Sequence, residues 1–182
     1  MKLESSCMIT GKCSDARWIK NAHLWPNHTK GKGLNFLELE PEMINHPRNF
    51  LRLHCELEHA FDRCQIILVP EWSLKRPSSK CFNLRVSILD PELKASTATL
   101  NGFTDLKWSE LDGRLSHWEF GRKIDQAPYT RILAQHQITS LKRAAEKEWV
   151  APSDLGEMKD RALRVLRHSL GEKADFHSAD NL

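Results

Sequence analysis

"NFLRLHCELEHAFDRC" (residues 49–64) joins an asparagine to a run of apolar residues interleaved with histidine and acidic side chains. The stretch predicts a helix over residues 50–62, because its apolar residues recur at helical spacing and so share one face. Asn49 stands immediately before this helix, where asparagine commonly acts as the N-cap. The apolar face consists of Phe50, Leu53, Leu57, Ala60 and Phe61.

A polar edge is expected beside this apolar face. His54, Glu58 and Asp62 are spaced four residues apart, which places them along one side of a helix. Since each residue turns a helix by about 100°, Glu58 falls at the border of the apolar face, whereas His59 points away from it. A strand packed on the apolar face can therefore present a side chain to Glu58 but hardly to His59. The alternative is that the edge is an ordinary solvated face.

Strands are predicted on both sides of the helix. Residues 16–25 roughly alternate between apolar and polar side chains, and residues 64–70 and 81–89 are apolar runs of strand length. The turn signals NG and DG, at 101–102 and 112–113, predict a hairpin or meander over residues 98–121.

Helices are predicted toward the end of the chain. One covers residues 128–149, and a last helix runs from a cap at Ser153 or Asp154 to about residue 170. Strands that come first and helices that come later indicate an α+β fold. We expect one domain over residues 1–150, followed over 151–182 by the C-terminal helix and a frayed tail.

The composition limits the class of protein. The 182 residues are 40% hydrophobic and 28% charged, which is typical of a globular chain. No run approaches the roughly 20 apolar residues of a membrane span, and the N-terminus lacks an apolar signal core. The five cysteines do not have the density of a disulfide scaffold, so an intracellular protein of the cytoplasm or nucleus is expected, without a membrane partner. The net charge of +3 permits a phosphate-rich partner without requiring one.

The order of several short motifs resembles the HNH endonuclease domain. In chain order the motifs are C-x-x-T-G (7–11), A-H-L-x-P (22–26), N-F-L-x-L (49–53), H-A-F-D (59–62) and I-I-L-V-P (66–70). The pattern is closest to the fungal group of these domains, whose C-terminal half is also similar to L-D-G-R (111–114) and R-I-L-A-Q-H (131–136). The resemblance covers residues 7–148. It implies a ββα-metal core, here extended by further strands and by C-terminal helices.

The resemblance also implies a function, that of a metal-dependent endonuclease which hydrolyses nucleic-acid phosphodiesters. His23 matches the general base that takes a proton from water, and Asn49 matches the central asparagine that supports it. The implied cofactor is a divalent cation, Mg²⁺ or Mn²⁺, with Zn²⁺ as the alternative. The implied partner is nucleic acid, DNA rather than RNA.

The sequence departs from the family at the last motif position. The family's second histidine stands nine residues after the asparagine, where this chain has Glu58, and His59 comes one place late. Many members also carry a metal-binding residue before the general base, where this chain has Ala22. A carboxylate is a competent ligand for Mg²⁺ or Mn²⁺. We therefore expect Glu58 to bind the metal with His54 as a helper, and His59 is the alternative.

Basic residues and cysteines complete the expected site. Nucleic-acid phosphates are expected to contact Lys30, Lys32, Arg48, Arg52 and Arg63, which surround the motifs in sequence. The cysteines contain no C-x-x-C pair, so buried free thiols are expected rather than a structural zinc site.

Two other functions fit the same residues. The glutamate at position 58 favours a catalytically degenerate HNH-derived domain that binds nucleic acid or a protein partner. The other alternative is an enzyme repurposed for a small-molecule substrate on the same scaffold, for which the nine histidines and six tryptophans are the only sign.

Overall fold

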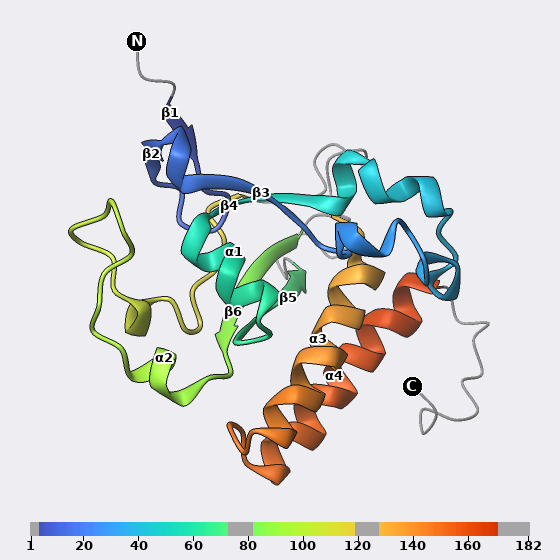
Figure 1. The fold of residues 1–182 in the computed structure, drawn as a ribbon. Helices are drawn as coiled ribbons and strands as arrows, with labels where there is room; N and C mark the ends of the chain where they lie inside the picture. The colour runs from blue at the N-terminus through green and yellow to red at the C-terminus, as the bar shows by residue number, and fades with distance from the viewer. Residues whose placement is uncertain (1–3, 73–81, 119–127, 171–182) are drawn as a thin grey trace.

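Three two-stranded antiparallel sheets hold the strands of the computed structural model, which describes residues 4–72, 82–118 and 128–170 (Figure 1). The paired strands are β1 (Glu4–Ser6) with β2 (Cys13–Asp15), β3 (Ile19–His23) with β4 (Phe50–His54), and β5 (Ile66–Trp72) with β6 (Phe82–Ile88). The helices are α1 (Cys55–Asp62), α2 (Pro91–Ala95), α3 (Thr130–Glu146) and α4 (Pro152–Leu170). This mixture of helices and antiparallel strands confirms the predicted α+β class.

The hairpin of β3 and β4 and the following helix α1 form a ββα unit. The register of the hairpin pairs His23 with Phe50 and Ala22 with Leu51. Since directly paired residues point to the same face of a sheet, Ala22 and Leu51 share the buried face and His23 lies on the other. α1 packs against both strands. The unit therefore brings the end of β3 and the polar side of α1 into one region of the molecule.

The prediction of one helix over residues 50–62 is wrong for its first part. Residues Phe50–His54 are strand β4, and α1 begins only at Cys55. Residues 50–53 fit a strand because Leu51 and Leu53 are buried while Phe50 and Arg52, which alternate with them, are partly exposed, a period of two. Asn49 consequently does not cap a helix. His54 does, since its Nδ1 atom accepts a hydrogen bond from the backbone N–H of Glu56.

The prediction of a hairpin or meander over residues 98–121 is also wrong in its described part. Residues 98–118 contain no paired strand beyond two isolated bridges, Thr99 with Lys107 and Leu115 with Arg85. The segment instead turns back on itself so that Leu100, Phe103 and Leu106 reach the core. Residues 119–121 lie outside the described part. The five further elements, at 16–25, 64–70, 81–89, 128–149 and up to 170, exist with shifted ends.

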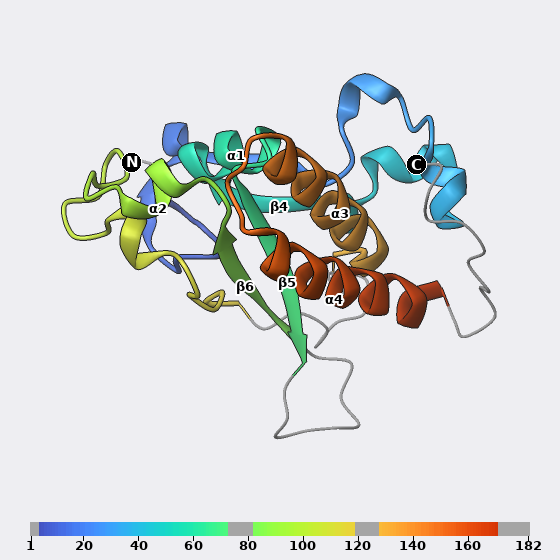
Figure 2. The same ribbon diagram turned by 90° about the horizontal axis from the view of Figure 1, so that it is seen from below.

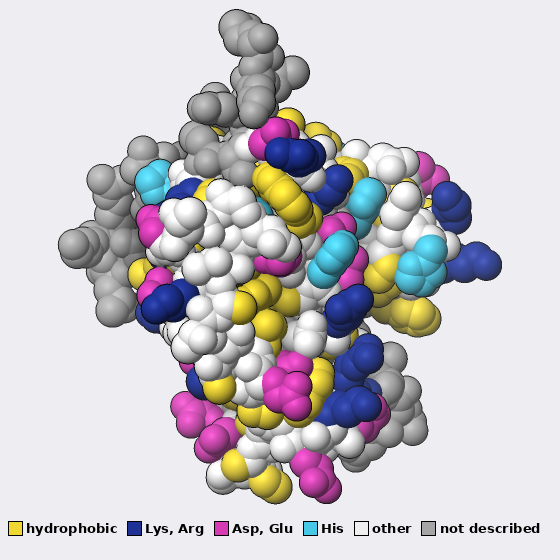
Figure 3. Space-filling view, turned by 60° about the vertical axis from the view of Figure 1, so that its left-hand side comes forward, with side chains coloured by type: hydrophobic (Ala, Val, Ile, Leu, Met, Phe, Trp, Pro, Cys, Tyr) yellow, Lys and Arg dark blue, Asp and Glu magenta, His cyan; other side chains and the backbone are white. Residues whose placement is uncertain are grey.

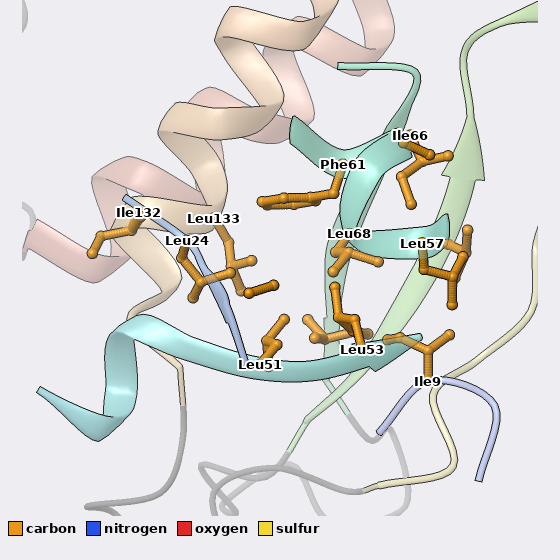
Figure 4. Packing of buried hydrophobic residues seen from close by; sticks show 14 of the residues in the cluster. Ile9, Leu24, Leu51, Leu53, Leu57, Phe61, Ile66, Leu68, Ile132 and Leu133 are labelled. Atoms are coloured by element: carbon orange, nitrogen blue, oxygen red, sulfur yellow. The ribbon is translucent and has the colours of Figure 1, made fainter. Parts of the chain in front are cut away.

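The main core is built from segments far apart in the sequence (Figure 4). Leu51 and Leu53 of the hairpin, Phe61 of α1 and Leu68 of β5 point toward one interior, and Leu133 of α3 closes it. α3 and α4 run side by side and antiparallel, and α3 packs on β5 (Figure 2). The C-terminal helix thus packs on the body of the protein, while the expected frayed tail lies among residues 171–182, outside the described part. None of the described helices is long and apolar enough to span a membrane.

Candidate functional site

His23 ends strand β3 at the border of the hairpin. Its ring contacts the ring of Phe50, its partner in the hairpin, with 4.2 Å between the ring centroids. Within the described part of the chain, the Nε2 atom is buried and has no hydrogen-bond partner. Burial lowers the pKa of His23 below its usual 6.5, and the charge of Asp62 acts in the opposite direction. The imidazole is therefore neutral near pH 7 and has a lone pair available, as a general base requires.

Asn49 is fully buried and closes the loop between the two strands. Its Oδ1 atom accepts a hydrogen bond from the backbone N–H of Trp25 at 2.8 Å. Its Nδ2 atom donates to the backbone carbonyl of Ile44, also at 2.8 Å. The backbone carbonyl of Asn49 accepts from the N–H of Leu24, the residue after His23. Asn49 therefore fixes the backbone that follows His23 and is not placed to react itself.

The polar side of α1 carries Glu58, His59 and Asp62. The side chain of Glu58 is 23% exposed and that of His59 is 65% exposed, which agrees with the expected positions of these two residues around the helix. A carboxylate oxygen of Glu58 lies 3.6 Å from Nε2 of His59. The two residues are thus neighbours, but Glu58 lies nearer the protein interior.

Asp62 is the residue of this site that the sequence placed on the polar edge of the helix without assigning it a role in the site. Reduced solvation raises the pKa of its carboxyl group, while the nearby His59 and His23 lower it. Among the described residues, Asp62 is the acidic group whose charge acts on His23 and opposes the lowering of its pKa. Two signals in the sequence point to Asp62: it ends the H-A-F-D motif, and it lies four residues after Glu58 on the same side of α1.

His54 does not join this group. Its Nε2 atom lies 2.8 Å from the carbonyl oxygen of Asn101, to which it donates, and its Nδ1 atom accepts from the N–H of Glu56 at 3.3 Å. The residue is completely buried, and burial lowers its pKa. Both ring nitrogens are in use, so neither is available to a metal ion.

The donor set fits one kind of metal site and not another. Among the described residues, no group of three His, Cys, Asp or Glu side chains is arranged to hold a metal. A closed zinc site needs three or four protein ligands, so these residues do not fit one. Mg²⁺ and Mn²⁺ are often held by one or two carboxylates, with water and substrate phosphates as the other ligands. Glu58 and Asp62, one turn apart on α1, fit that second arrangement.

The five expected phosphate-contacting residues are spread around the hairpin and α1. Lys30 and Lys32 are exposed in the loop after β3, and Arg63 is exposed at the end of α1. Arg48 lies over the ring of Tyr129 at 4.2 Å, and Arg52 lies over that of Trp118 at 5.9 Å. On the face seen in Figure 3, histidine side chains lie beside acidic ones, and Lys and Arg side chains are distributed around them.

One comparison with known proteins bears on this site. Residues 7–69 match the family model of the HNH endonuclease. The matched region contains β2, the ββα unit and most of β5, and with them His23, Asn49, Glu58 and Asp62. The similarity expected for residues 70–148 lies outside it. No curated protein and no solved structure matches the chain at a significant level.

Proposed function

We propose that the chain is an endonuclease of the HNH type, which hydrolyses nucleic-acid phosphodiesters with His23 as the general base. The observation that supports the proposal best is the environment of the His23 ring. Its buried Nε2 atom has no hydrogen-bond partner among the described residues, and burial lowers its pKa. The ββα unit that presents it lies inside the region matched by the HNH endonuclease model.

In this reaction the chain contributes a base and a fixed geometry. His23 takes a proton from the attacking water, and Asp62 stabilises the imidazolium that forms because its carboxylate charge is close. Asn49 bonds to the backbone of Trp25 and of Ile44, at the two ends of the long loop between β3 and β4, and so fixes the backbone that follows His23. A divalent cation, when bound, supplies positive charge for the phosphorane and the leaving oxygen.

The proposed cation ligands are Asp62 and Glu58, and the proposed ion is Mg²⁺ or Mn²⁺. Glu58 takes the place at which the family pattern expects histidine. A carboxylate is a hard ligand and suits a hard cation such as Mg²⁺ or Mn²⁺. On this proposal, glutamate in place of histidine at position 58 preserves the cation site. We also propose, from the family pattern alone, that DNA is preferred to RNA and that the fungal group contains the nearest relatives.

A plasmid-nicking assay tests the proposal. Supercoiled DNA is expected to be nicked with Mg²⁺ or Mn²⁺ and to stay intact in EDTA. His23→Ala should lower the rate by about 10² to 10⁴-fold, the usual contribution of a general base. His28→Ala is the matched control, because His28 is an exposed histidine of the loop that follows β3, and its replacement should leave the rate unchanged. Nicking by the His23→Ala protein at the rate of the unchanged protein would contradict the mechanism.

The same assay assigns the cation ligands. Glu58→Gln and Asp62→Asn remove a carboxylate charge with little change of shape, so both should raise the Mg²⁺ concentration needed for half of the maximal rate. His59→Ala should not, because that side chain is largely exposed. A shift seen only with His59→Ala would assign the site to that histidine instead.

A second function, nucleic-acid binding without cleavage, is favoured by one observation. The described residues contain no group of three metal-binding side chains. On this alternative, DNA stays intact at any cation concentration but is bound in a salt-sensitive manner, since phosphate contacts release counterions.

A further inference from the structure

Residues 25–44 form most of the connection between β3 and β4 and are called the 25–44 loop here. Asn49 holds both of its ends, because one amide side chain bonds to the backbone of Trp25 and of Ile44. In Figure 1 the loop runs from blue to cyan beside the start of α3. There, an NH1 atom of Arg131 donates to the carbonyl of Leu37 at 2.6 Å. The loop is therefore fixed at its base and again beside α3.

The interior of the loop is fixed as well. Gly31 has a φ of +80°, and a Cβ atom there would clash with the backbone carbonyl of Pro41. Gly33 has a φ of +90°, and a Cβ atom there would lie 2.9 Å from the indole ring of Trp25. That indole donates through Nε1 to the carbonyl of Lys32 at 3.1 Å. The loop therefore follows a path that requires glycine at two positions, and one side-chain hydrogen bond stabilises that path.

Phe36 projects from this fixed loop into solvent. The residue belongs to a short 3₁₀ turn, Leu34–Leu37, whose two leucines are buried in the core. Its own side chain is 75% exposed, the most exposed large apolar side chain of the described residues. A single exposed apolar residue is common on protein surfaces. Phe36 differs because hydrogen bonds of Asn49, Trp25 and Arg131 hold the backbone of the loop that carries it.

The charges near Phe36 favour a nucleic-acid partner on one side of the ring. Lys30 and Lys32 precede it in the loop, on the branch that comes from His23, and both are exposed. The other branch is acidic, since Glu38, Glu40 and Glu42 are all exposed there, and the carboxylate of Glu38 is 3.8 Å from the guanidinium of Arg131. A nucleic-acid backbone that lies along the branch after His23 would contact Lys30 and Lys32 first and the ring of Phe36 next. Cationic side chains beside an exposed aromatic ring are typical of surfaces that stack on bases.

We propose that Phe36 stacks on, or inserts beside, a base of the nucleic-acid substrate, with Lys30 and Lys32 on the adjacent phosphates. The inference rests on the proposed function, since it names how the same substrate is held. The ring removes a base from its normal stacking partner, and the fixed loop sets the distance from that base to the phosphodiester at His23. Phe36 is thus a positioning residue for the substrate and takes no part in the proton transfer.

Binding to a DNA duplex that contains 2-aminopurine tests the inference. The fluorescence of this base rises when it is unstacked. The test uses the His23→Ala protein, so that the duplex is not cut, with the probe base placed in turn at each position around the preferred cleavage site. The fluorescence should rise on binding at one position. Adding Phe36→Ala should abolish the rise and weaken binding about 5- to 100-fold, the range for loss of one base–aromatic stack.

Two controls interpret the result. Phe36→Trp keeps an aromatic ring and should retain the binding affinity for the duplex, which a merely structural role of Phe36 would not require. Leu115→Ala removes another apolar side chain at the surface, which is 43% exposed. It should change neither the 2-aminopurine fluorescence nor the affinity for the duplex.

The outcomes separate this inference from the proposed function. If the protein nicks DNA and Phe36→Ala changes neither binding nor fluorescence, the inference is overturned and the nuclease proposal stands. If no duplex is bound at low salt, both are overturned. If Phe36→Ala leaves DNA binding intact but abolishes self-association in sedimentation measurements, the ring serves a protein contact and the inference is again overturned.

Discussion

Asn49 shows how a single side chain organises the candidate site. It is buried, and both atoms of its amide group bond to backbone atoms that lie 24 and 5 residues away in the chain. A carboxylate at this position would keep the bond from Trp25 but would face the carbonyl of Ile44 with a second acceptor. Only an amide satisfies both partners, which is a physical reason for the asparagine that needs no direct role in the reaction.

Replacing Asn49 should therefore loosen the loop more than it disturbs the sheet. Asn49→Ala leaves the N–H of Trp25 and the carbonyl of Ile44 without that partner, at a cost of about 2 to 4 kcal/mol in the free energy of unfolding. Amide hydrogen exchange should accelerate in residues 25–44 and remain slow in β5 and β6. Asn49→Asp should also destabilise the protein. Exchange that accelerates equally in all strands would show that the residue stabilises the whole fold rather than the loop.

At the scale of elements, helix α1 is held at both ends by segments outside the ββα unit. At its start, Glu56 accepts hydrogen bonds from the backbone N–H and the side-chain amide of Asn101, at 3.0 and 2.5 Å. At its end, the ring of His136 in α3 stacks on Phe61, with 3.6 Å between centroids and 5° between planes. The Nε2 atom of His136 also donates to the carbonyl of Phe61 at 2.9 Å. The position of Asp62, the next residue, thus depends on α3.

The contact of His136 with Phe61, which connects α3 to α1, should make the free energy of unfolding depend on pH. Loss of water from the His136 ring lowers its pKa to about 4, and the hydrogen bond to Phe61 only partly opposes this. The folded protein therefore keeps this ring neutral, while the unfolded chain takes up a proton near pH 6.5. Stability should fall as the pH falls from about 6.5 to about 4. Between pH 7.5 and 5, this residue alone accounts for about 2 kcal/mol.

Urea unfolding of His136→Gln measures this contribution. The variant loses the stack and should be less stable than the unchanged protein at pH 7.5. At pH 5 the difference in the free energy of unfolding between the two proteins should be smaller by about 2 kcal/mol. The unchanged protein loses that stability through His136, whereas glutamine does not titrate. Gln137→Leu is the control from the same helix: it removes the 3.0 Å bond to the carbonyl of Leu68 but no titratable group. The free energy of unfolding of Gln137→Leu should differ from that of the unchanged protein by the same amount at both pH values.

At the scale of the whole molecule, the region that matches the HNH endonuclease model shares its hydrophobic core with segments that lie beyond it. The main cluster takes Leu84 and Val86 from β6, and Ile132 and Leu133 from α3. The two motif segments C-x-x-T-G and L-D-G-R also meet, since Arg114 donates to the carbonyl of Thr10 at 3.5 Å. The segments beyond residue 69 therefore complete the interior on which the ββα unit rests.

A fragment of residues 1–72 should consequently not fold by itself. Without β6 and α3 it would expose most of the side chains that its strands and α1 bury, and apolar burial is the main stabilising contribution to folding. Circular dichroism should show a largely unfolded fragment with no cooperative thermal transition, whereas the 182-residue chain should unfold cooperatively. A fragment with a sharp transition and dispersed amide resonances would contradict this dependence.

Some features of this protein follow from the sequence alone. Strand and helix periodicities are local, so the α+β class and the places of β5, β6, α3 and α4 could be predicted with shifts at their ends. The order of motifs likewise indicated the HNH pattern and placed His23 at a strand end. The relative positions of Glu58 and His59 follow from the helical repeat, which depends only on the spacing of the residues.

Other features, namely the strand at residues 50–54 and the roles of His54 and Asp62, depend on contacts between segments that are distant in the sequence. Residues 50–54 fit a helical pattern and an alternating pattern equally well, and pairing with β3 decided in favour of the strand. His54 has the chemistry of a ligand, but bonds to Asn101 and Glu56 occupy both of its nitrogens. Asp62 gains its importance from proximity to His23, across 39 residues of chain. Such contacts depend on how distant segments pack together, and no local pattern of residues encodes that packing.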